Sequence, residues 1–416
     1  MAEIKEALRD LNPWWKADFT LEFKQREIYS QLQKFLPLPQ IIALTGLRRV
    51  GKTTILFKIA EDYLKKNIPP RNILYFSFDE FKDVELRKVL QNYEELTDLD
   101  LKQGKFVVLF DEIQKVSNWE NQLKSIYDLW GKRIKIVISG SESLIVKKKL
   151  KETLAGRIFE FKVEPLTFRE FLHFKDITYK PSLLYEKESQ KLLKEYTQTM
   201  GFPELISITD KEIIKKYIRE SIVEKIIYRD LPQLYNIKNV SIIESLLNIF
   251  IEEPGQLVEI SGLAQEFKLS RQTLSNYLQY LEDSFLLKKL YNFSKSRRKV
   301  ERKLKKYYPT ILSPDLLFKE DTLSKSKVFE WLLATQLKSE FFWRDPQKHE
   351  VDLILVKEKV IPVEIKFGKI EWEGLLVFMK KFNLTEGIII SYTHHETKKI
   401  MGKTIKIIPA YIFLAE

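Results

Sequence analysis

The chain contains no cysteine and only four histidines among its 416 residues. Without cysteine it can form neither a disulfide nor a thiolate metal site. The histidines are too scattered along the sequence to predict a zinc site: His173, His349, His394 and His395. These absences exclude a redox or zinc-dependent function built on those residue types.

Long apolar runs are also missing. No segment approaches the roughly 18 to 20 uninterrupted apolar residues of a membrane-spanning helix, and the N-terminus, MAEIKEALRD, is charged from its third residue. We therefore expect no membrane partner and a cytoplasmic location. Hydrophobic residues make up 44% of the chain, which is enough for packed cores, and this length predicts about two to four domains.

The charge is unbalanced toward the positive, with a formal net charge of +12. An excess of this size favours a polyanionic partner, with nucleic acid ahead of an anionic membrane surface. The alternative interpretation is a charge-rich surface of the thermophilic kind, because lysine, arginine and glutamate are all abundant. The two interpretations are compatible.

A glycine-rich motif follows a short apolar run at residues 40–44. The sequence GLRRVGKTT occupies residues 46–54, and the helical pattern ILFKIAEDYLKK comes next. The order strand, loop, helix predicts a P-loop that binds ATP, in which Lys52 acts on the β and γ phosphates and Thr53 binds Mg²⁺. The expected nucleotide-binding residues are Gly46, Leu47, Arg48, Arg49, Val50, Gly51, Lys52, Thr53 and Thr54.

Two adjacent carboxylates end the apolar run at residues 106–110. We predict that Asp111 supports the Mg²⁺ ion and that Glu112 activates the attacking water as general base. The alternative role for both is to cap the helix that follows. A further apolar run, residues 134–138, ends near Ser139 and Ser141, and we expect Ser139 to contact the γ-phosphate or to orient the water.

An arginine often completes such a site by stabilising the charge on the transferred phosphoryl group. Arg157 precedes the last strand and is the preferred candidate, acting from a neighbouring subunit or a moving domain. Arg48 and Arg49 are the alternatives, and a surface salt bridge is the structural interpretation of Arg157. With strands near 73–78 and 158–163, the segment predicts an α/β fold whose five-stranded parallel sheet has helices on both faces.

Residues 166–240 are helical in pattern, and a sharper signal follows. Three short helices are expected between 241 and 284, the last beginning at Ser270, with an inward face at Leu274, Tyr277, Leu278 and Leu281. The outward side chains are of base-reading types: Arg271, Gln272, Thr273 and Asn276. Residues 285–294 are expected to form a two-stranded wing. This predicts a DNA-binding winged helix, or alternatively a protein-binding module.

Between residues 288 and 306 the sequence carries ten basic residues and only one acidic residue. Such a run would follow phosphates and make binding sensitive to salt, and Arg297, Arg298 and Lys299 form its centre. Its alternative interpretation is a solvated linker.

The C-terminal segment orders a helix at 326–340, the strand FFWR, a strand containing Asp352 and a strand VIPVEIKFG. Glu364 and Lys366 alternate on the last strand, so their side chains share a face. We predict that Asp352 and Glu364 hold Mg²⁺, that Glu330 adds a ligand and that Lys366 orients the water for phosphodiester cleavage. A surface Glu-x-Lys ladder is the alternative.

Several of these segments together resemble AAA-type archaeal and bacterial ATPases with a winged helix and a C-terminal restriction-endonuclease-like, PD-(D/E)xK domain. The resemblance rests on GLRRVGKTT, VVLFDEIQ, SGSES, LAGR, MGFPEL, the winged-helix segment, FWRDPQKHEVDLILV and VEIKFG. It implies ATP and Mg²⁺ as cofactors and four parts: an ATPase core at 1–165, a helical lid at 166–240, a winged helix at 241–295 and a nuclease-like domain at 296–416.

Three functions are compatible with these features. The leading hypothesis is an ATP-driven DNA-binding ATPase whose C-terminal domain engages or cuts the nucleic acid. The second is a nucleotide-dependent switch or scaffold whose partner is a protein, with an inactive nuclease-like domain. A homo-oligomer is a separate alternative for the partner. The third is a nuclease that ATP regulates.

Overall fold

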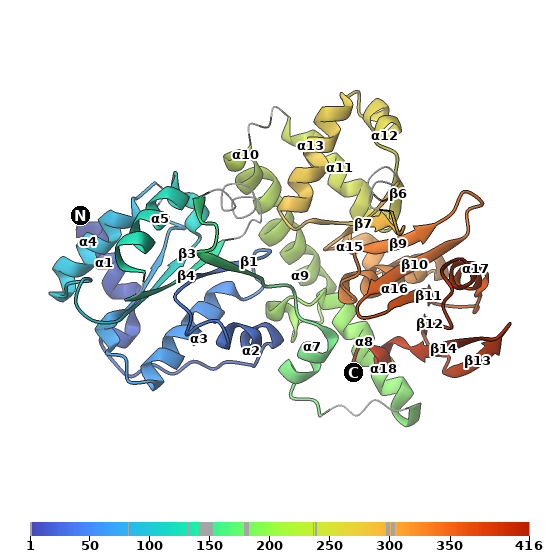
Figure 1. Ribbon diagram of the computed structural model, residues 1–416, viewed down its shortest axis with the longest axis horizontal. Coiled ribbons are helices and arrows are strands. Elements are labelled where there is room, and N and C mark those ends of the chain that lie inside the picture. The colour runs from blue at the N-terminus through green and yellow to red at the C-terminus, as the bar shows by residue number, and fades with distance from the viewer. Residues whose placement is uncertain are drawn as a thin grey trace. The chain divides into compact units, whose positions relative to one another are not determined.

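A computed structural model describes residues 2–81, 83–131, 133–140, 153–178, 183–235, 237, 239–296, 300 and 304–415. The chain divides into two compact units, residues 1–165 and 166–416, and each is described by itself (Figure 1). Among the described residues, no helix combines the length and the apolar character that a membrane crossing requires.

The N-terminal unit contains one sheet of five parallel strands in the order β2-β3-β4-β1-β5. The predicted parallel sheet is therefore confirmed. Its strands are β1 (Ile41–Thr45), β2 (Ile73–Ser77), β3 (Phe106–Asp111), β4 (Ile134–Gly140) and β5 (Ile158–Lys162). The α-helices are α1 (Ala2–Leu11), α2 (Glu27–Gln33), α3 (Lys52–Lys65), α4 (Leu86–Thr97) and α5 (Trp119–Trp130). Short 3-10 helices span Pro13–Trp15, Pro70–Asn72 and Ile113–Lys115.

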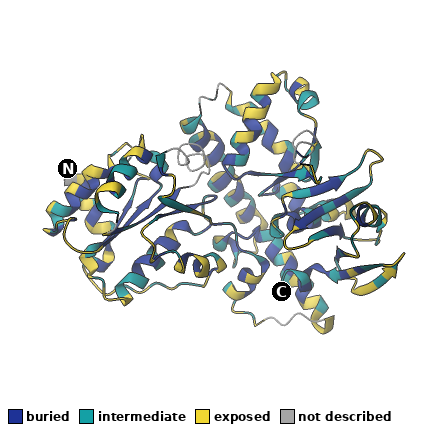
Figure 2. Ribbon diagram, in the orientation of Figure 1, coloured by how far each residue is buried: buried dark blue, intermediate teal, exposed yellow. Residues whose placement is uncertain are grey.

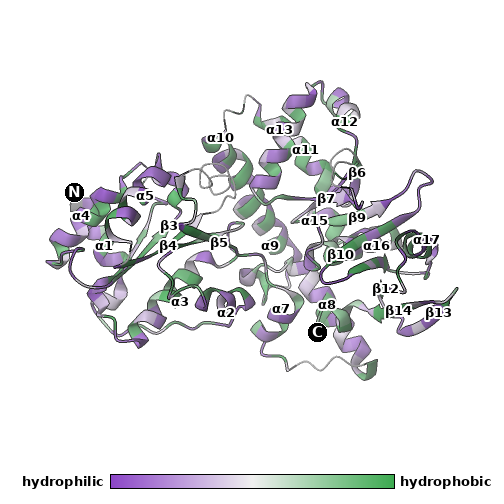
Figure 3. Ribbon diagram, viewed as in Figure 1, coloured by the Kyte–Doolittle hydropathy of each residue, from purple (hydrophilic) through white to green (hydrophobic). Residues whose placement is uncertain are grey.

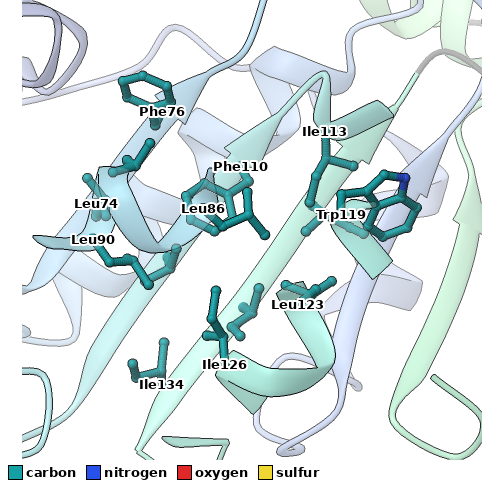
Figure 4. Close-up of a cluster of buried hydrophobic side chains, with 14 of the residues drawn as sticks. Leu74, Phe76, Leu86, Leu90, Phe110, Ile113, Trp119, Leu123, Ile126 and Ile134 are labelled. Atoms are coloured by element: carbon teal, nitrogen blue, oxygen red, sulfur yellow. The ribbon is translucent and has the colours of Figure 1, made fainter. Parts of the chain in front are cut away.

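The sheet is buried on both faces, which explains why its inner strands are continuous apolar runs rather than alternating ones. All residues of β1 and β3 are buried, and these strands are dark in Figure 2 and largely hydrophobic in Figure 3. Helices α1, α4 and α5 cover one face. Figure 4 shows this core, in which Leu74 and Phe110 from the strands meet Leu86 from α4 and Leu123 from α5.

The C-terminal unit begins with helices, as the pattern of residues 166–240 predicts. They are α7 (Phe168–Phe174), α8 (Glu186–Thr199), α9 (Lys211–Lys216), two π-helical segments (Tyr217–Val223 and Ile226–Asp230) and α10 (Leu231–Leu234). Two short 3-10 helices span Leu183–Tyr185 and Pro203–Leu205. A π-helical stretch is an unusual backbone form that is frequent near functional sites.

A mixed sheet of nine strands follows, in the order β13-β14-β12-β11-β10-β9-β7-β8-β6. Its strands are β6 (Gln256–Val258), β7 (Leu287–Asn292), β8 (Lys305–Pro309), β9 (Phe341–Arg344), β10 (Glu350–Val356), β11 (Val360–Lys366), β12 (Glu386–Ser391), β13 (Glu396–Ile400) and β14 (Lys403–Pro409). Its helices are α11 (Val240–Glu252), α12 (Ile260–Glu266), α13 (Arg271–Asp283), α15 (Pro314–Leu317), α16 (Thr322–Gln336), α17 (Glu373–Phe382) and α18 (Ala410–Phe413).

One sequence expectation about this sheet is wrong. Residues 285–294 do not form a two-stranded wing, because they contribute a single strand, β7, whose antiparallel partner is β8 beyond residue 304. The alternating run contains no glycine or proline at which the chain could reverse, so the strand continues to Asn292. Since β8 also pairs with β6, these three strands cross the boundary that the sequence predicts at 295/296.

Candidate nucleotide site and carboxylate cluster

The loop between β1 and α3 is shaped by glycines. Gly46 has φ +145°, and a Cβ atom on it would lie 2.1 Å from the backbone oxygen of Val163. Gly51 has φ +94° and immediately precedes α3. Both backbone conformations strongly favour glycine, and at Gly46 the backbone of Val163, just after β5, also leaves no room for a side chain. The glycines of the motif are therefore required by the turn itself.

Lys52 begins α3 and folds back over the loop. Its Nζ atom donates hydrogen bonds to the carbonyl oxygens of Gly46 at 3.0 Å and Leu47 at 2.8 Å, and the residue is buried. Leu47 and Val50 are buried as well, whereas Arg49, Thr53 and Thr54 are exposed at the start of the helix. Backbone groups of the loop, the Lys52 ammonium group and the N-terminus of α3 therefore lie together, which suits the binding of a phosphate chain.

Asp111 connects the loop to the two neighbouring strands. Its Oδ2 atom accepts hydrogen bonds from Thr53 Oγ1 at 2.7 Å and from Tyr75 Oη at 3.0 Å. Its Oδ1 atom accepts from the Ser139 hydroxyl and from the Glu112 amide. The structure therefore brings together Thr53, Asp111 and Ser139, which the sequence selected separately.

Tyr75 is part of this network although sequence reasoning missed it. Burial, reinforced by the adjacent carboxylate of Asp111, raises the pKa of Tyr75 well above its usual value, so the hydroxyl remains a donor. The only signal in the sequence was a polar-tipped aromatic residue within the apolar strand that precedes β3. That signal is weak, because tyrosine is common in buried strands.

Glu112 adopts the left-handed backbone conformation, with φ 55° and ψ 41°. It sits at the N-cap position of the 3-10 helix Ile113–Lys115, yet its side chain makes no capping hydrogen bond. The carboxylate instead accepts a hydrogen bond from Gln114 Nε2. A non-glycine residue held in this conformation carries about 1–3 kcal/mol of strain, and such strain gathers at functional sites. The capping alternative for Glu112 therefore has no support in the geometry.

Arg26, a buried residue that the sequence analysis did not identify, hydrogen-bonds to the P-loop. Arg26 donates from Nη1 to the Val50 carbonyl oxygen at 3.0 Å and from Nη2 to the Glu164 carbonyl oxygen at 2.7 Å. It precedes α2 and is far from the motif in sequence, so no local pattern could have indicated it. Its guanidinium fixes the loop relative to the segment that follows β5.

Arg157 is not brought to these residues. It precedes β5, at the edge of the sheet where the parallel strands begin, whereas the P-loop and Asp111 lie where strands end. Its Nε atom pairs with Asp128 Oδ1 at 2.9 Å, which matches its alternative interpretation as a surface salt bridge. A role for Arg157 in phosphoryl transfer would require a second copy of the chain. Ser141 lies outside the described residues.

The parallel sheet with this loop and its buried aspartate defines a P-loop domain of the nucleotide-binding class. Comparison with known proteins agrees, because residues 38–172 match the family described as "AAA domain". Residues 190–310 match a domain of unknown function (DUF8612). Residues 38–172 therefore belong to the AAA-type P-loop family.

Three relatives extend the similarity beyond the AAA domain. An uncharacterized protein of Methanocaldococcus jannaschii is 30% identical over 338 residues, which cover 77% of this chain and 73% of the relative. A second uncharacterized protein of the same organism is 29% identical over 390 residues, or 84% of this chain and 80% of the relative. An uncharacterized protein of Haemophilus influenzae is 30% identical over 272 residues, covering 64% of this chain and 66% of the relative.

A cluster of carboxylates lies at one place in the C-terminal unit. Its four side chains come from three elements: Glu330 from α16, Glu350 and Asp352 from β10, and Glu364 from β11. Asp352 Oδ2 accepts a hydrogen bond from the Ile365 amide at 2.7 Å, which fixes the aspartate against β11. The antiparallel pairing of β10 with β11 thus brings Asp352 to the strand that carries the Glu-x-Lys pair.

Both predicted metal ligands, Asp352 and Glu364, have raised pKa values. Burial, followed by the nearby charge of Glu364, raises the pKa of Asp352 well above its usual value. Burial likewise raises the pKa of Glu364. Lys366 Nζ lies 2.8 Å from Glu364 Oε1, whereas the buried Oε2 atom of Glu364 has no hydrogen-bond partner among the described residues. An unsatisfied buried carboxylate oxygen is costly, and a divalent cation would satisfy it.

The predicted third ligand is differently engaged. Glu330 Oε1 accepts hydrogen bonds from Lys306 Nζ at 2.9 Å and from Tyr308 Oη at 2.6 Å. Across the described part of the chain, no group of three or more carboxylate or histidine side chains is arranged to hold a metal ion. Asp352 and Glu364 would therefore have to hold a cation without Glu330, whose Oε1 atom is already engaged.

The basic run at residues 288–306 does not present all of its lysines to nucleic acid, contrary to the sequence prediction. The residue is 4% exposed and faces the carboxylates, so it is not available to follow a nucleic acid backbone. Lys289 is likewise paired with Glu282 at 2.8 Å. The centre of the run, Arg297, Arg298 and Lys299, lies outside the described residues.

Helix α13 has the two faces that its spacing predicts. Its apolar positions are buried, namely Leu274, Tyr277, Leu278 and Leu281. Arg271, Gln272 and Asn276 are exposed, and Gln272 Nε2 donates to Asn276 Oδ1 at 3.0 Å. Thr273 is only partly exposed, because its amide and hydroxyl contact the capping Ser270 side chain.

Proposed function

We propose that this chain binds and hydrolyses ATP with Mg²⁺, and that Glu112 is the general base. The main support is the convergence of Lys52, Thr53 and Asp111 at the end of the parallel strands, with Glu112 strained beside them. When bound, Mg²⁺ would neutralise charge on the β and γ phosphates. Thr53 and Asp111 would hold it, Ser139 would fix Asp111, and Glu112 would take the proton of the attacking water.

The test of this proposal is ATP binding and turnover by the full chain. Lys52→Ala should abolish nucleotide binding, because the ammonium that reaches the phosphates is removed. Lys65→Ala is a matched control, since Lys65 ends the same helix and pairs at the surface with Glu61. If Lys52→Ala binds ATP as tightly as the unchanged chain, the proposed site is wrong.

We further propose that residues 240–309 form a winged helix that binds DNA. Three helices, α11 to α13, and the small antiparallel set β6, β8 and β7 have the elements of that motif in the expected order. The exposed side chains of α13, Arg271, Gln272 and Asn276, are types that contact base edges. The net charge of +12 agrees with a polyanionic partner.

ATP hydrolysis measured with single-stranded, double-stranded and branched DNA across salt concentrations tests this part. Stimulation that fades as salt rises supports DNA as the partner, because phosphate contacts release counterions. Arg271→Ala together with Gln272→Ala should reduce the stimulation. A rate that no DNA changes would favour the alternative, a nucleotide-dependent switch whose partner is a protein.

A second activity, Mg²⁺-dependent phosphodiester cleavage, is supported by one observation in the C-terminal unit. The buried Oε2 atom of Glu364 has no hydrogen-bond partner in the part of the chain that the structure describes, and it lies on the strand that also presents Lys366. In this proposal Asp352 and Glu364 hold the cation, and Lys366 orients the water. Asp352→Ala should remove cleavage and leave ATP turnover unchanged, whereas cleavage that survives the substitution would rule out this site.

A further inference from the structure

Lys306 lies among the carboxylates of the C-terminal unit as a fully desolvated cation. Its Nζ atom is 2.9 Å from Glu330 Oε1, 2.8 Å from Glu350 Oε1 and 3.8 Å from Asp352 Oδ1. A buried ammonium group is tolerated only where opposite charges and hydrogen bonds replace its water. Carboxylate oxygens are also the ligands that divalent metal ions such as Mg²⁺ prefer.

The Lys306 end of the cluster is closed. Gly255, with φ +82°, sits against it so tightly that a Cβ atom would lie 3.0 Å from Glu330 Oε1 and 3.3 Å from Lys306 Cε. The second oxygen of Glu350 is taken by Arg344 Nη1 at 3.1 Å. The turn between α11 and β6 therefore packs directly on the lysine and its partners, and the ammonium group of Lys306 fills the space between Glu330 and Glu350.

The other end of the cluster is different. Within the described part of the chain, the Oε2 atom of Glu364 has no hydrogen-bond partner, although the residue is only 8% exposed. Across the cluster, three cationic side chains accompany four carboxyl groups. They are Lys306, Arg344 and Lys366 with Glu330, Glu350, Asp352 and Glu364. A second divalent cation at the Glu330–Glu350 end would be repelled by the ammonium group of Lys306.

We propose that Lys306 takes the place of a metal ion at the Glu330–Glu350 end, so that the cluster accepts one divalent cation, between Asp352 and Glu364. Lys306 is then a positioning residue that sets how many metal ions the site holds. The inference rests on the proposed metal site at Glu364, and the experiment separates the two.

The experiment counts Mn²⁺ ions bound to the nucleotide-free full chain, using the electron paramagnetic resonance signal of free Mn²⁺. Every protein carries Thr53→Ala, so that the P-loop does not contribute. The starting chain should bind one Mn²⁺, and Lys306→Met should bind two. Lys305→Met is the matched control, because Lys305 is the neighbouring residue of β8 and its Nζ atom contacts the Val300 carbonyl oxygen at 2.8 Å instead. It should bind one.

Different failures point to different steps. If the starting chain binds one Mn²⁺ and Lys306→Met also binds one, the role of Lys306 is wrong and the metal site stands. If the starting chain binds none and Lys306→Met binds one, Lys306 has the proposed role and the site at Glu364 is wrong. Binding by neither protein overturns both.

A second pair of variants keeps Lys306 and covers the case in which Lys306→Met does not fold. Glu364→Gln should lose the bound Mn²⁺, because it removes the unsatisfied oxygen. Glu330→Gln should retain it, because Glu330 is held by Lys306 and Tyr308. Equal loss of Mn²⁺ in the two variants would contradict the proposal.

Discussion

Replacing Gly46 by alanine tests how tightly the loop is built. The glycine has φ +145°, and the added Cβ would lie 2.1 Å from the backbone oxygen of Val163. The strained backbone costs about 1–3 kcal/mol, and relieving the clash costs about 1–3 kcal/mol more. Because Lys52 donates to the Gly46 carbonyl at 3.0 Å, any relief of this strain shifts the ammonium from the phosphate site.

We expect Gly46→Ala to lower the unfolding temperature and to weaken ATP binding by at least about tenfold, or 1.4 kcal/mol. Calorimetric titration of ATP, with thermal unfolding of the same samples, measures both effects. Gly156→Ala is the control: its φ is +73°, but no atom of the described residues lies within 4 Å of the added Cβ. It should cost only the backbone strain of about 1–2 kcal/mol and leave ATP affinity unchanged. Unchanged ATP affinity in Gly46→Ala would refute the reasoning.

Two further substitutions test other parts of the N-terminal unit. Arg26→Met removes charge-assisted hydrogen bonds to the backbone, including the one to the Val50 carbonyl, and each contributes about 1.5–3 kcal/mol. The substitution should lower both the unfolding temperature and the ATP affinity. Unchanged values would show that Arg26 does not stabilise the loop. Although burial opposes ionisation, hydrogen bonds from Lys58, Lys65 and a backbone amide lower the pKa of Glu61 to about 2. This stabilisation is present above about pH 4.5 and is lost toward pH 2, so Glu61→Gln should flatten the acid dependence of the unfolding temperature, and an identical slope would contradict it.

The sequence could predict those parts of the structure that depend on local patterns. Apolar runs located all five strands of the parallel sheet, and spacing located the buried face of α13. The motif at 46–54 and the Asp-Glu pair were recognisable because their chemistry needs neighbouring residues in a fixed order. Asp352 and Glu364 could be linked because a hairpin joins their strands.

Long-range partners could not be predicted in the same way. Arg26 reaches the loop from a segment before α2, and Tyr75 reaches Asp111 from the adjacent strand. Lys306 lies in a run of basic residues, and no sequence pattern distinguishes it from the other lysines of that run. Only the pairing of β8 between β6 and β7 turns its side chain toward the carboxylates, and sheet order of this kind has no local signature.

The most direct test of the central claim, that this chain hydrolyses ATP with Glu112 as general base, is a comparison of ATP binding and turnover in the unchanged chain and in Glu112→Gln. The substitution keeps the size of the side chain and removes its ability to accept a proton. We expect the ATP affinity of Glu112→Gln to lie within about twofold of that of the unchanged chain and its turnover to be lower by about a hundredfold or more. Full turnover in Glu112→Gln would contradict it.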